Sequence, residues 1–255
     1  MSELLLDTLQ QIKQQLDESG ENNLPYRFLF LGYTDIHAAD AWYVSHFGED
    51  AVEKLENREN FEKLREIHGR GSDVSKVPTL RSLVSLMFGD DVVFDVIDFQ
   101  TYEGSEMIVD LNLPVADEHH DRYDLVIDNG TTEHVFDYAQ ALRNCARMCR
   151  RRGYVFHAVP MNWPNHGFYN LSPTLFHDFY EDNGFKTVSC TGKAKALVNG
   201  VEQQLNIDLP PTERFNFSQI NGIEVNLHYL VKKLETVEDF TNPVQHKYRD
   251  ASAWI

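Results

Sequence analysis

The sequence predicts an α/β protein built on a mostly parallel sheet. Short apolar runs alternate along the chain with segments of helical periodicity, as in folds whose parallel strands are joined by helices. The run Leu125–Ile127 is apolar at every position, which is expected of a strand buried on both faces. Polar side chains follow it directly, at Asp128 and Asn129. In open α/β sheets, ligands bind at such carboxyl ends of strands.

The composition predicts one globular domain over residues 1–255. Of these 255 residues 42% are hydrophobic, enough for a sizeable core. The 40 acidic and 23 basic residues give a net charge of −17, which argues against binding to nucleic acid or to an anionic membrane surface. Three cysteines without a CxxC spacing and an acidic N-terminus without a signal-peptide pattern favour a cytoplasmic location.

The two ends of the chain have different patterns. Residues 1–24 are predicted to contain an amphipathic helix, because four apolar residues recur at helical spacing: Leu5, Leu9, Ile12 and Leu16. One short stripe buries little surface, so we expect this helix to cap the domain, and a homo-oligomer contact is the alternative. Residues 235–255 lack a periodic pattern and are expected to form a tail or an oligomer contact.

Strands are expected on both sides of a helical insertion. The first, Arg27–Gly32, is apolar until it stops at glycine. Residues 38–89 are helical in character and too long for one crossover helix, so they are predicted to form a lid beside the site or extra helices that only pack on the sheet. The second strand is expected to end at Asp98 and a short third strand at Asp110.

Further strands are expected after the central one, at residues 154–160, 186–190 and 224–231. A helix follows the first of these, with Ser172 as its cap and Pro173 in its first turn. The long polar connection before the last strand is predicted to be a second cover over the site.

A series of features in fixed order resembles the central segment of class I S-adenosylmethionine-dependent methyltransferases. They are Asp124–Asp128, Thr132–Val135, a helix, a basic turn at Gly153 and a strand ending at Pro160. The resemblance extends over residues 27–184, with a last strand near Val225. It implies a Rossmann-like sheet of seven strands, the last antiparallel, with helices on both faces. It also implies S-adenosyl-L-methionine as cofactor and S-adenosyl-L-homocysteine as product.

The resemblance places the cofactor at the ends of the first four strands. It assigns cofactor binding to Gly32, Tyr33, Asp98, Asp110, Leu111, Asp128 and Asn129. Asp98 is expected to accept hydrogen bonds from both ribose hydroxyls, and Asp110 a bond from the adenine amino group. Read as residues alone, both acids could instead cap turns. The loop Gly32–Asp35 departs from the family because it has a single glycine.

Two histidines fall at strand ends expected to face the same cleft. Methyl transfer to a hydroxyl needs alignment and removal of a proton, and histidine is a suitable base near neutral pH. We predict that His166 is the base and that His134 orients the acceptor or the base; each could instead only brace its own loop. The segment from His166 to Phe176 resembles a subgroup associated with cell-surface saccharide biosynthesis. That implies O-methylation of a saccharide or nucleotide sugar.

Other functions and sites remain as alternatives. A catalytically inactive binding or assembly subunit is one, and the glycine-poor loop favours it. A nicotinamide-dependent oxidoreductase is another, disfavoured because Gly32–Asp35 lacks the G-x-G-x-x-G spacing. No metal is expected: some related methyltransferases bind a divalent ion through Glu-x-x-Glu-His, and here Gly130 stands at the first ligand position. The histidines of Glu118–Asp121 are predicted to be solvated.

Overall fold

The computed structural model describes residues 2–19, 24–36, 38–60, 62–63, 75–100, 107–198, 201–213 and 223–249. Contacts within the chain divide it into two compact units. The first contains Met1–Arg27 and Tyr33–Phe94, and the second contains Phe28–Gly32 and Asp95–Ile255. Among the described residues, no helix is both long and apolar enough to cross a membrane.

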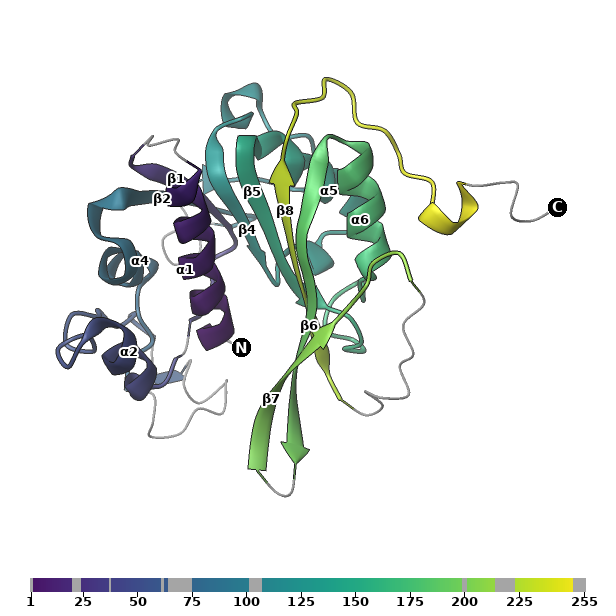
Figure 1. Ribbon diagram of the computed structural model, residues 1–255. Coiled ribbons are helices and arrows are strands. Elements are labelled where there is room, and N and C mark those ends of the chain that lie inside the picture. The colour runs from purple at the N-terminus through teal and green to yellow at the C-terminus, as the bar shows by residue number, and fades with distance from the viewer. Residues whose placement is uncertain are drawn as a thin grey trace. The chain divides into compact units, whose positions relative to one another are not determined.

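A single sheet of eight strands is described, in the order β3-β2-β1-β4-β5-β8-β6-β7 (Figure 1). The strands are β1 (Tyr26–Leu31), β2 (Val92–Asp98), β3 (Met107–Ile108), β4 (Tyr123–Asn129), β5 (Cys149–Pro160), β6 (Phe185–Val198), β7 (Val201–Asp208) and β8 (Val225–Lys233). β4 runs parallel to β1 and β5, and β2 runs parallel to β3. β8 is antiparallel to both β5 and β6. The predicted parallel sheet with an antiparallel last strand is therefore confirmed.

The sequence reading missed one strand, β7. β6 runs on to Val198, past the predicted end at Cys190, and β7 returns beside it as an antiparallel hairpin. Apolar Val201, Leu205 and Ile207 in β7 are separated by polar residues, a pattern typical of a strand with one solvated face. The long polar connection predicted here therefore contains a strand that the sequence analysis did not predict. Residues 214–222 of that connection lie outside the described residues, so its role as a cover stays a prediction.

The core of the second unit lies between the sheet and two helices. Residues 125–127 of β4 are each 0% exposed, as predicted for the central strand. α5 (Tyr138–Met148) and α6 (Pro173–Asp182) share one hydrophobic cluster with alternate residues of β4, β5 and β8. The rings of Tyr138 and Phe176 meet edge to face at 6.3 Å, so the two helices cover the same face (Figure 1).

The first unit is helical, as predicted. Its described helices are α1 (Ser2–Glu18), α2 (Asp40–Phe47) and α4 (Leu80–Phe88), followed by the 3-10 turn η1 (Gly89–Asp91). The four apolar residues of the N-terminal stripe are buried. The indole N–H of Trp42 in α2 donates to Asp7 of α1 at 3.2 Å. Residues 61 and 64–74 of the predicted helical insertion lie outside the described residues, and the lid role stays a prediction.

Short 3-10 turns complete the second unit: η2 (Asp117–His119), η3 (Thr132–His134) and η5 (His246–Tyr248). His119 was expected to be solvated, but it is only 9% exposed. The N–H of His119 donates to the carbonyl of Ala116 at 2.9 Å within this 3-10 turn.

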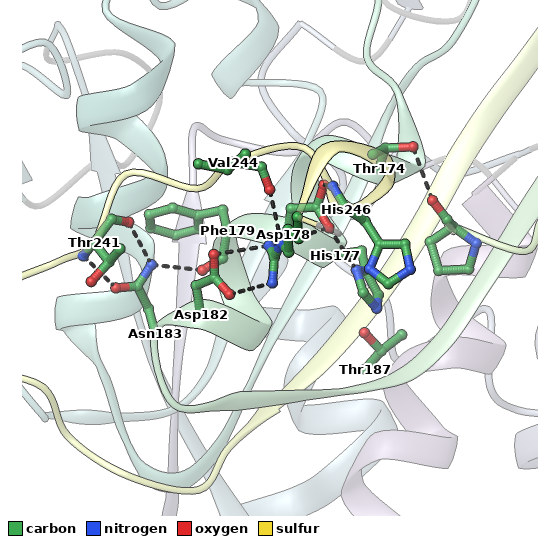
Figure 2. Close-up of polar contacts among 12 residues, drawn as sticks. Thr174, His177, Asp178, Phe179, Asp182, Asn183, Thr187, Thr241, Val244 and His246 are labelled. Atoms are coloured by element: carbon green, nitrogen blue, oxygen red, sulfur yellow. Dashed lines mark hydrogen bonds and ion pairs between the residues drawn. The ribbon is translucent and has the colours of Figure 1, made fainter. Parts of the chain in front are cut away.

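The C-terminal segment lies along α6 (Figure 2). The amide of Asn183 donates to the carbonyl of Thr241 at 3.0 Å and its oxygen accepts from the N–H of Thr241 at 2.8 Å. The guanidinium of Arg249 donates to both carboxylate oxygens of Asp182 at 2.7 and 2.8 Å. The predicted tail is thus held against its own chain as far as Arg249.

Candidate functional site

The candidate site lies where the strand order reverses. β2 and β3 lie on one side of β1, and β5 lies beyond β4 on the other, so the reversal falls between β1 and β4. In open α/β sheets, the carboxyl ends of the strands at such a switch point form the ligand crevice. The N–H of Gly32 donates to the carbonyl of Ile97 at 2.8 Å, which brings the ends of β1 and β2 together.

Gly32 is in close contact with the turn after β4. Its φ is +72°, and a Cβ there would lie 2.8 Å from Oγ1 of Thr131 and 3.9 Å from Oδ2 of Asp98. The Thr131 hydroxyl donates to the carbonyl of Leu31 at 2.5 Å. Glycine is therefore required here by a contact within the protein. Asp98 is half-buried beside it, and its Oδ1 accepts from the N–H of Gln100 at 3.3 Å.

Asp110 and Leu111 follow β3. Oδ1 of Asp110 accepts from the backbone N–H of Asn112 at 2.9 Å and from its side-chain amide at 2.8 Å. These bonds lower the pKa of Asp110 below its ordinary value. They form the turn cap that was considered beside adenine binding, and the adenine role of Asp110 stays a prediction. Leu111 is 6% exposed, and its carbonyl accepts from the amide of Asn144 at 3.0 Å.

Asp128, expected among the cofactor-binding residues, faces the protein interior. Side chains alternate along a strand, so Asp128 points to the same face as Val126, toward α6. One oxygen accepts from the N–H groups of Thr131 and Thr132 at 3.2 and 3.0 Å. The other lies 2.5 Å from the Thr132 hydroxyl and 2.7 Å from Nδ1 of His157. Asn129 is half-buried at the end of the strand.

His157 was not singled out from the sequence. It pairs with Asp128 across the β4–β5 ladder, and its Nε2 lies 2.7 Å from the hydroxyl of Tyr180 in α6. Asp128 and His157 are both 0% exposed. This buried chain of hydrogen bonds ties the turn after β4 to β5 and α6. The sequence signal that could have identified His157 is its position as a polar residue within an otherwise apolar strand.

Tyr33 belongs to the first unit. Its hydroxyl accepts from the N–H of Leu80 at 3.0 Å, and its ring lies 4.3 Å from the guanidinium carbon of Arg58. Arg58 in turn forms an ion pair with Asp35. These contacts connect the loop after β1 to the start of α4. The cofactor role assigned to Tyr33 stays a prediction.

The structure brings both predicted histidines together around one carboxylate. Glu133 is 0% exposed, and within the described chain neither of its carboxylate oxygens has a hydrogen-bond partner. Nε2 of His166 lies 3.6 Å from Oε1 of Glu133, and Nε2 of His134 lies 3.8 Å from the same oxygen. The two imidazole rings are 5.4 Å apart between centroids. Glu133 itself was not among the residues predicted to form the site.

Gly167 allows the loop after β5 to approach the turn after β4. The N–H of Phe168 donates to the carbonyl of Glu133 at 2.9 Å. A Cβ on Gly167 would lie 2.8 Å from that carbonyl oxygen and 2.9 Å from Cγ of Glu133. The base of the loop is held by Asn162, whose side chain donates to the carbonyl of Ile223 at 2.8 Å. His166 is thereby fixed beside Glu133.

The environment of Glu133 and His134 favours the neutral form of both side chains. Burial, and then the nearby Asp128 carboxylate, raise the pKa of Glu133 far above its ordinary value. Burial, and then the neighbouring His166, lower the pKa of His134 below its ordinary value. A neutral imidazole has a free lone pair on one nitrogen. The free imidazole nitrogen can therefore accept a proton or bind a cation.

No protein-family model and no curated protein sequence matches this chain. Solved structures with a similar fold include a protein assigned as a sarcosine dimethylglycine methyltransferase from Galdieria sulphuraria, 12% identical over 91% of this chain and 87% of that chain, with a TM-score of 0.47. The CMeT domain of the citrinin polyketide synthase is 11% identical over 91% of this chain and 53% of its own, with a TM-score of 0.43. The antibiotic-resistance methyltransferase Kmr is 9% identical over 86% and 91%, with a TM-score of 0.37.

Proposed function

We propose that the protein is an S-adenosylmethionine-dependent methyltransferase acting on a hydroxyl group of a saccharide or nucleotide sugar. One observation carries the proposal: Asp98 at the end of β2 lies beside Gly32 at the end of β1, next to the switch point of the sheet. In nucleoside-binding α/β folds, an acid at this place accepts hydrogen bonds from the ribose. The cofactor would supply a methyl group on a sulfonium.

The acceptor is proposed to bind at the neighbouring strand ends, those of β4 and β5. His134 and His166 lie there with side chains 49% and 42% exposed, so a solvent-borne substrate can reach them. His166 would take the proton of the acceptor hydroxyl as its oxygen attacks the methyl carbon. His134 would orient the acceptor through its neutral imidazole.

The charge balance supports a small-molecule acceptor. A net charge of −17 opposes binding to nucleic acid and to anionic membranes. We extend the proposal to a cytoplasmic enzyme of carbohydrate biosynthesis, because His166–Phe176 resembles the saccharide-associated subgroup and the cysteine usage favours the cytoplasm.

A catalytically inactive binding or assembly subunit is the second candidate function. The side chain of Thr131 favours it, because its hydroxyl occupies the space beside Gly32 that a cofactor would otherwise approach. The two candidates differ in whether the protein binds S-adenosylhomocysteine, which makes ligand binding the deciding measurement.

Calorimetric titration with S-adenosylhomocysteine and with NAD tests the proposal. We expect the first ligand to bind and NAD not to bind. Asp98→Asn should weaken binding by roughly 10-fold or more, because hydrogen bonds to a charged group contribute about 1.5–3 kcal/mol. Glu118→Gln is the matched control, since it removes the same charge from an exposed position before β4. An absence of S-adenosylhomocysteine binding in the unmodified protein would leave the binding-subunit alternative.

Activity is measured as the gain of one CH₂ group in candidate sugar nucleotides by mass spectrometry. His166→Ala is expected to lower turnover while the affinity for S-adenosylhomocysteine is unchanged. Full turnover in that variant would exclude His166 from acceptor activation.

A further inference from the structure

Glu133, His134 and His166 form a cluster, here called the Glu-His-His cluster, whose ligand atoms all lie within 4.8 Å of one another. The distances of 3.6 and 3.8 Å from Oε1 of Glu133 to the two imidazole nitrogens are too long for hydrogen bonds. A buried carboxyl group carries a negative charge at low cost only when it is paired or coordinates a metal. Glu133 is fully buried, and within the described chain neither carboxylate oxygen has a hydrogen-bond partner.

We propose that the Glu-His-His cluster binds a divalent transition-metal cation, for which Zn²⁺ is the best match. Two imidazoles and one carboxylate are a known ligand set for catalytic zinc, with one position open to water or substrate. Ligand atoms about 2.1 Å from a tetrahedral ion are about 3.4 Å from each other. The observed separations of 3.6 and 3.8 Å come within a small side-chain rotation of that value. Mg²⁺ and Ca²⁺ fit poorly because they prefer oxygen ligands.

The cluster is accessible from one side and held from the other. Its two imidazoles are half-exposed, whereas its carboxylate is buried, so a cation can enter from solvent and keep an open coordination position. Behind the carboxylate, Asp128 fixes the turn through Thr132. Gly167 and Phe168 fix the second loop against Glu133. Both segments that supply ligands are therefore held by the surrounding structure.

No metal is predicted from the sequence because the ligand pattern within the segment from Gly130 to His134 lacks its first ligand. His166 comes from a separate loop after β5, which spacing along the chain does not connect to Glu133. The proposal therefore goes against that expectation.

The catalytic role of the cation rests on the proposed function, whereas its binding does not. A bound cation takes the lone pair of His166, which then acts as a ligand and not as the base. The acceptor hydroxyl would coordinate at the open position and lose its proton to solvent. Its oxygen then bonds to the methyl carbon, the carbon–sulfur bond breaks, and sulfur keeps the electron pair. Oxidation states of the metal do not change, so redox-inactive Zn²⁺ suffices.

Calorimetric titration of the chelator-treated 255-residue chain with ZnCl₂ tests the binding. His134→Ala, His166→Ala and Glu133→Gln should each weaken Zn²⁺ binding by more than about 100-fold, since loss of an outer-shell partner alone costs about 10–100-fold. His246→Ala, at an exposed position in η5, should bind as the unmodified protein does. The proposal would be overturned if the three cluster variants bound Zn²⁺ as tightly as the unmodified chain does, or if the unmodified chain did not bind Zn²⁺.

A second measurement protects against misfolded variants. CoCl₂ should give visible absorption bands typical of four-coordinate Co²⁺ in the unmodified protein, and His166→Ala should lose them while keeping its far-UV circular dichroism. Bands unchanged in His166→Ala would contradict the ligand assignment.

The catalytic role of the cation is tested separately from the cofactor site. The affinity for S-adenosylhomocysteine is measured in parallel, so that a defect in cofactor binding is distinguished from a defect in Zn²⁺ binding. Methyl transfer should stop with a chelator and return with ZnCl₂; transfer unaffected by the chelator would overturn the catalytic role.

Discussion

Gly167 is the residue on which the geometry of the Glu-His-His cluster depends most directly. It lies against the main chain of Glu133 at a distance that leaves no room for a side chain. The hydrogen bond from the N–H of Phe168 to Glu133 then fixes the loop. Because His166 precedes this contact by one residue, a shift of the loop moves its imidazole away from the carboxylate.

We predict that Gly167→Ala lowers the free energy of unfolding by about 1–3 kcal/mol, the usual cost of inserting a methylene into packed structure. It should also weaken Zn²⁺ binding, because the loop must move outward. Urea unfolding and calorimetry measure the two effects. Phe168→Ala is the control: its side chain is 66% exposed, and its stability should change by about 0.5 kcal/mol or less. Equal stability of the two variants would show that the loop has room for a Cβ.

At the scale of elements, α6 connects the site to the end of the chain. Its Tyr180 meets His157 behind the turn after β4, and Asn183 at its C-cap holds Thr241. Asn183 is 1% exposed, and its amide also donates to the carbonyl of Phe179 at 2.7 Å. Removing this side chain takes away these hydrogen bonds from the buried carbonyl of Phe179 and from the N–H and carbonyl of Thr241.

Asn183→Ala is expected to cost about 1–3 kcal/mol of stability, the penalty for leaving buried polar groups unpaired. The segment from Thr241 to Arg249 should then be cleaved faster in limited proteolysis. As a control, Asp182→Ala breaks the exposed pair with Arg249, which should contribute only about 0–1 kcal/mol. A cleavage rate that does not change in Asn183→Ala would mean that other contacts hold the segment.

At the scale of the whole molecule, the sheet buries a titratable group that the proposed chemistry does not use. His228 lies in β8 between Ala158 of β5 and Thr191 of β6, and it is 4% exposed. Its ring meets Phe156 edge to face at 5.3 Å. Burial, and then the charge of Lys193, lower the pKa of His228 from 6.5 to about 3.

This shift predicts acid-sensitive stability. Between pH 6.5 and about 3 the unfolded chain binds a proton at His228 that the folded chain does not bind. Stability should therefore fall as the pH falls through this window, by up to about 1.4 kcal/mol per pH unit from this group. His228→Leu should flatten the dependence measured by urea unfolding at pH 7 and pH 4, relative to His246→Leu at an exposed site. Parallel curves for the two variants would rule out His228 as a source of the acid sensitivity.

The sequence by itself determined most of the strands, the central buried strand, the N-terminal helix and the strand ends at which the two histidines lie. These features depend on periodicity and on turn residues, which are local properties of the chain. Strand β7 was not predicted because its polar and apolar residues alternate, and the sequence of a solvated edge strand is then similar to that of a polar connection.

Only the tertiary structure decided which polar groups meet. It turned Asp128 inward to His157 and Tyr180, used Asp110 in a turn, and brought His166 to Glu133. The physical reason is that these contacts join separate strand ends and loops, and their distances depend on how the sheet pairs and packs. Gly167, which has no Cβ, allowed the loop that carries His166 to approach Glu133.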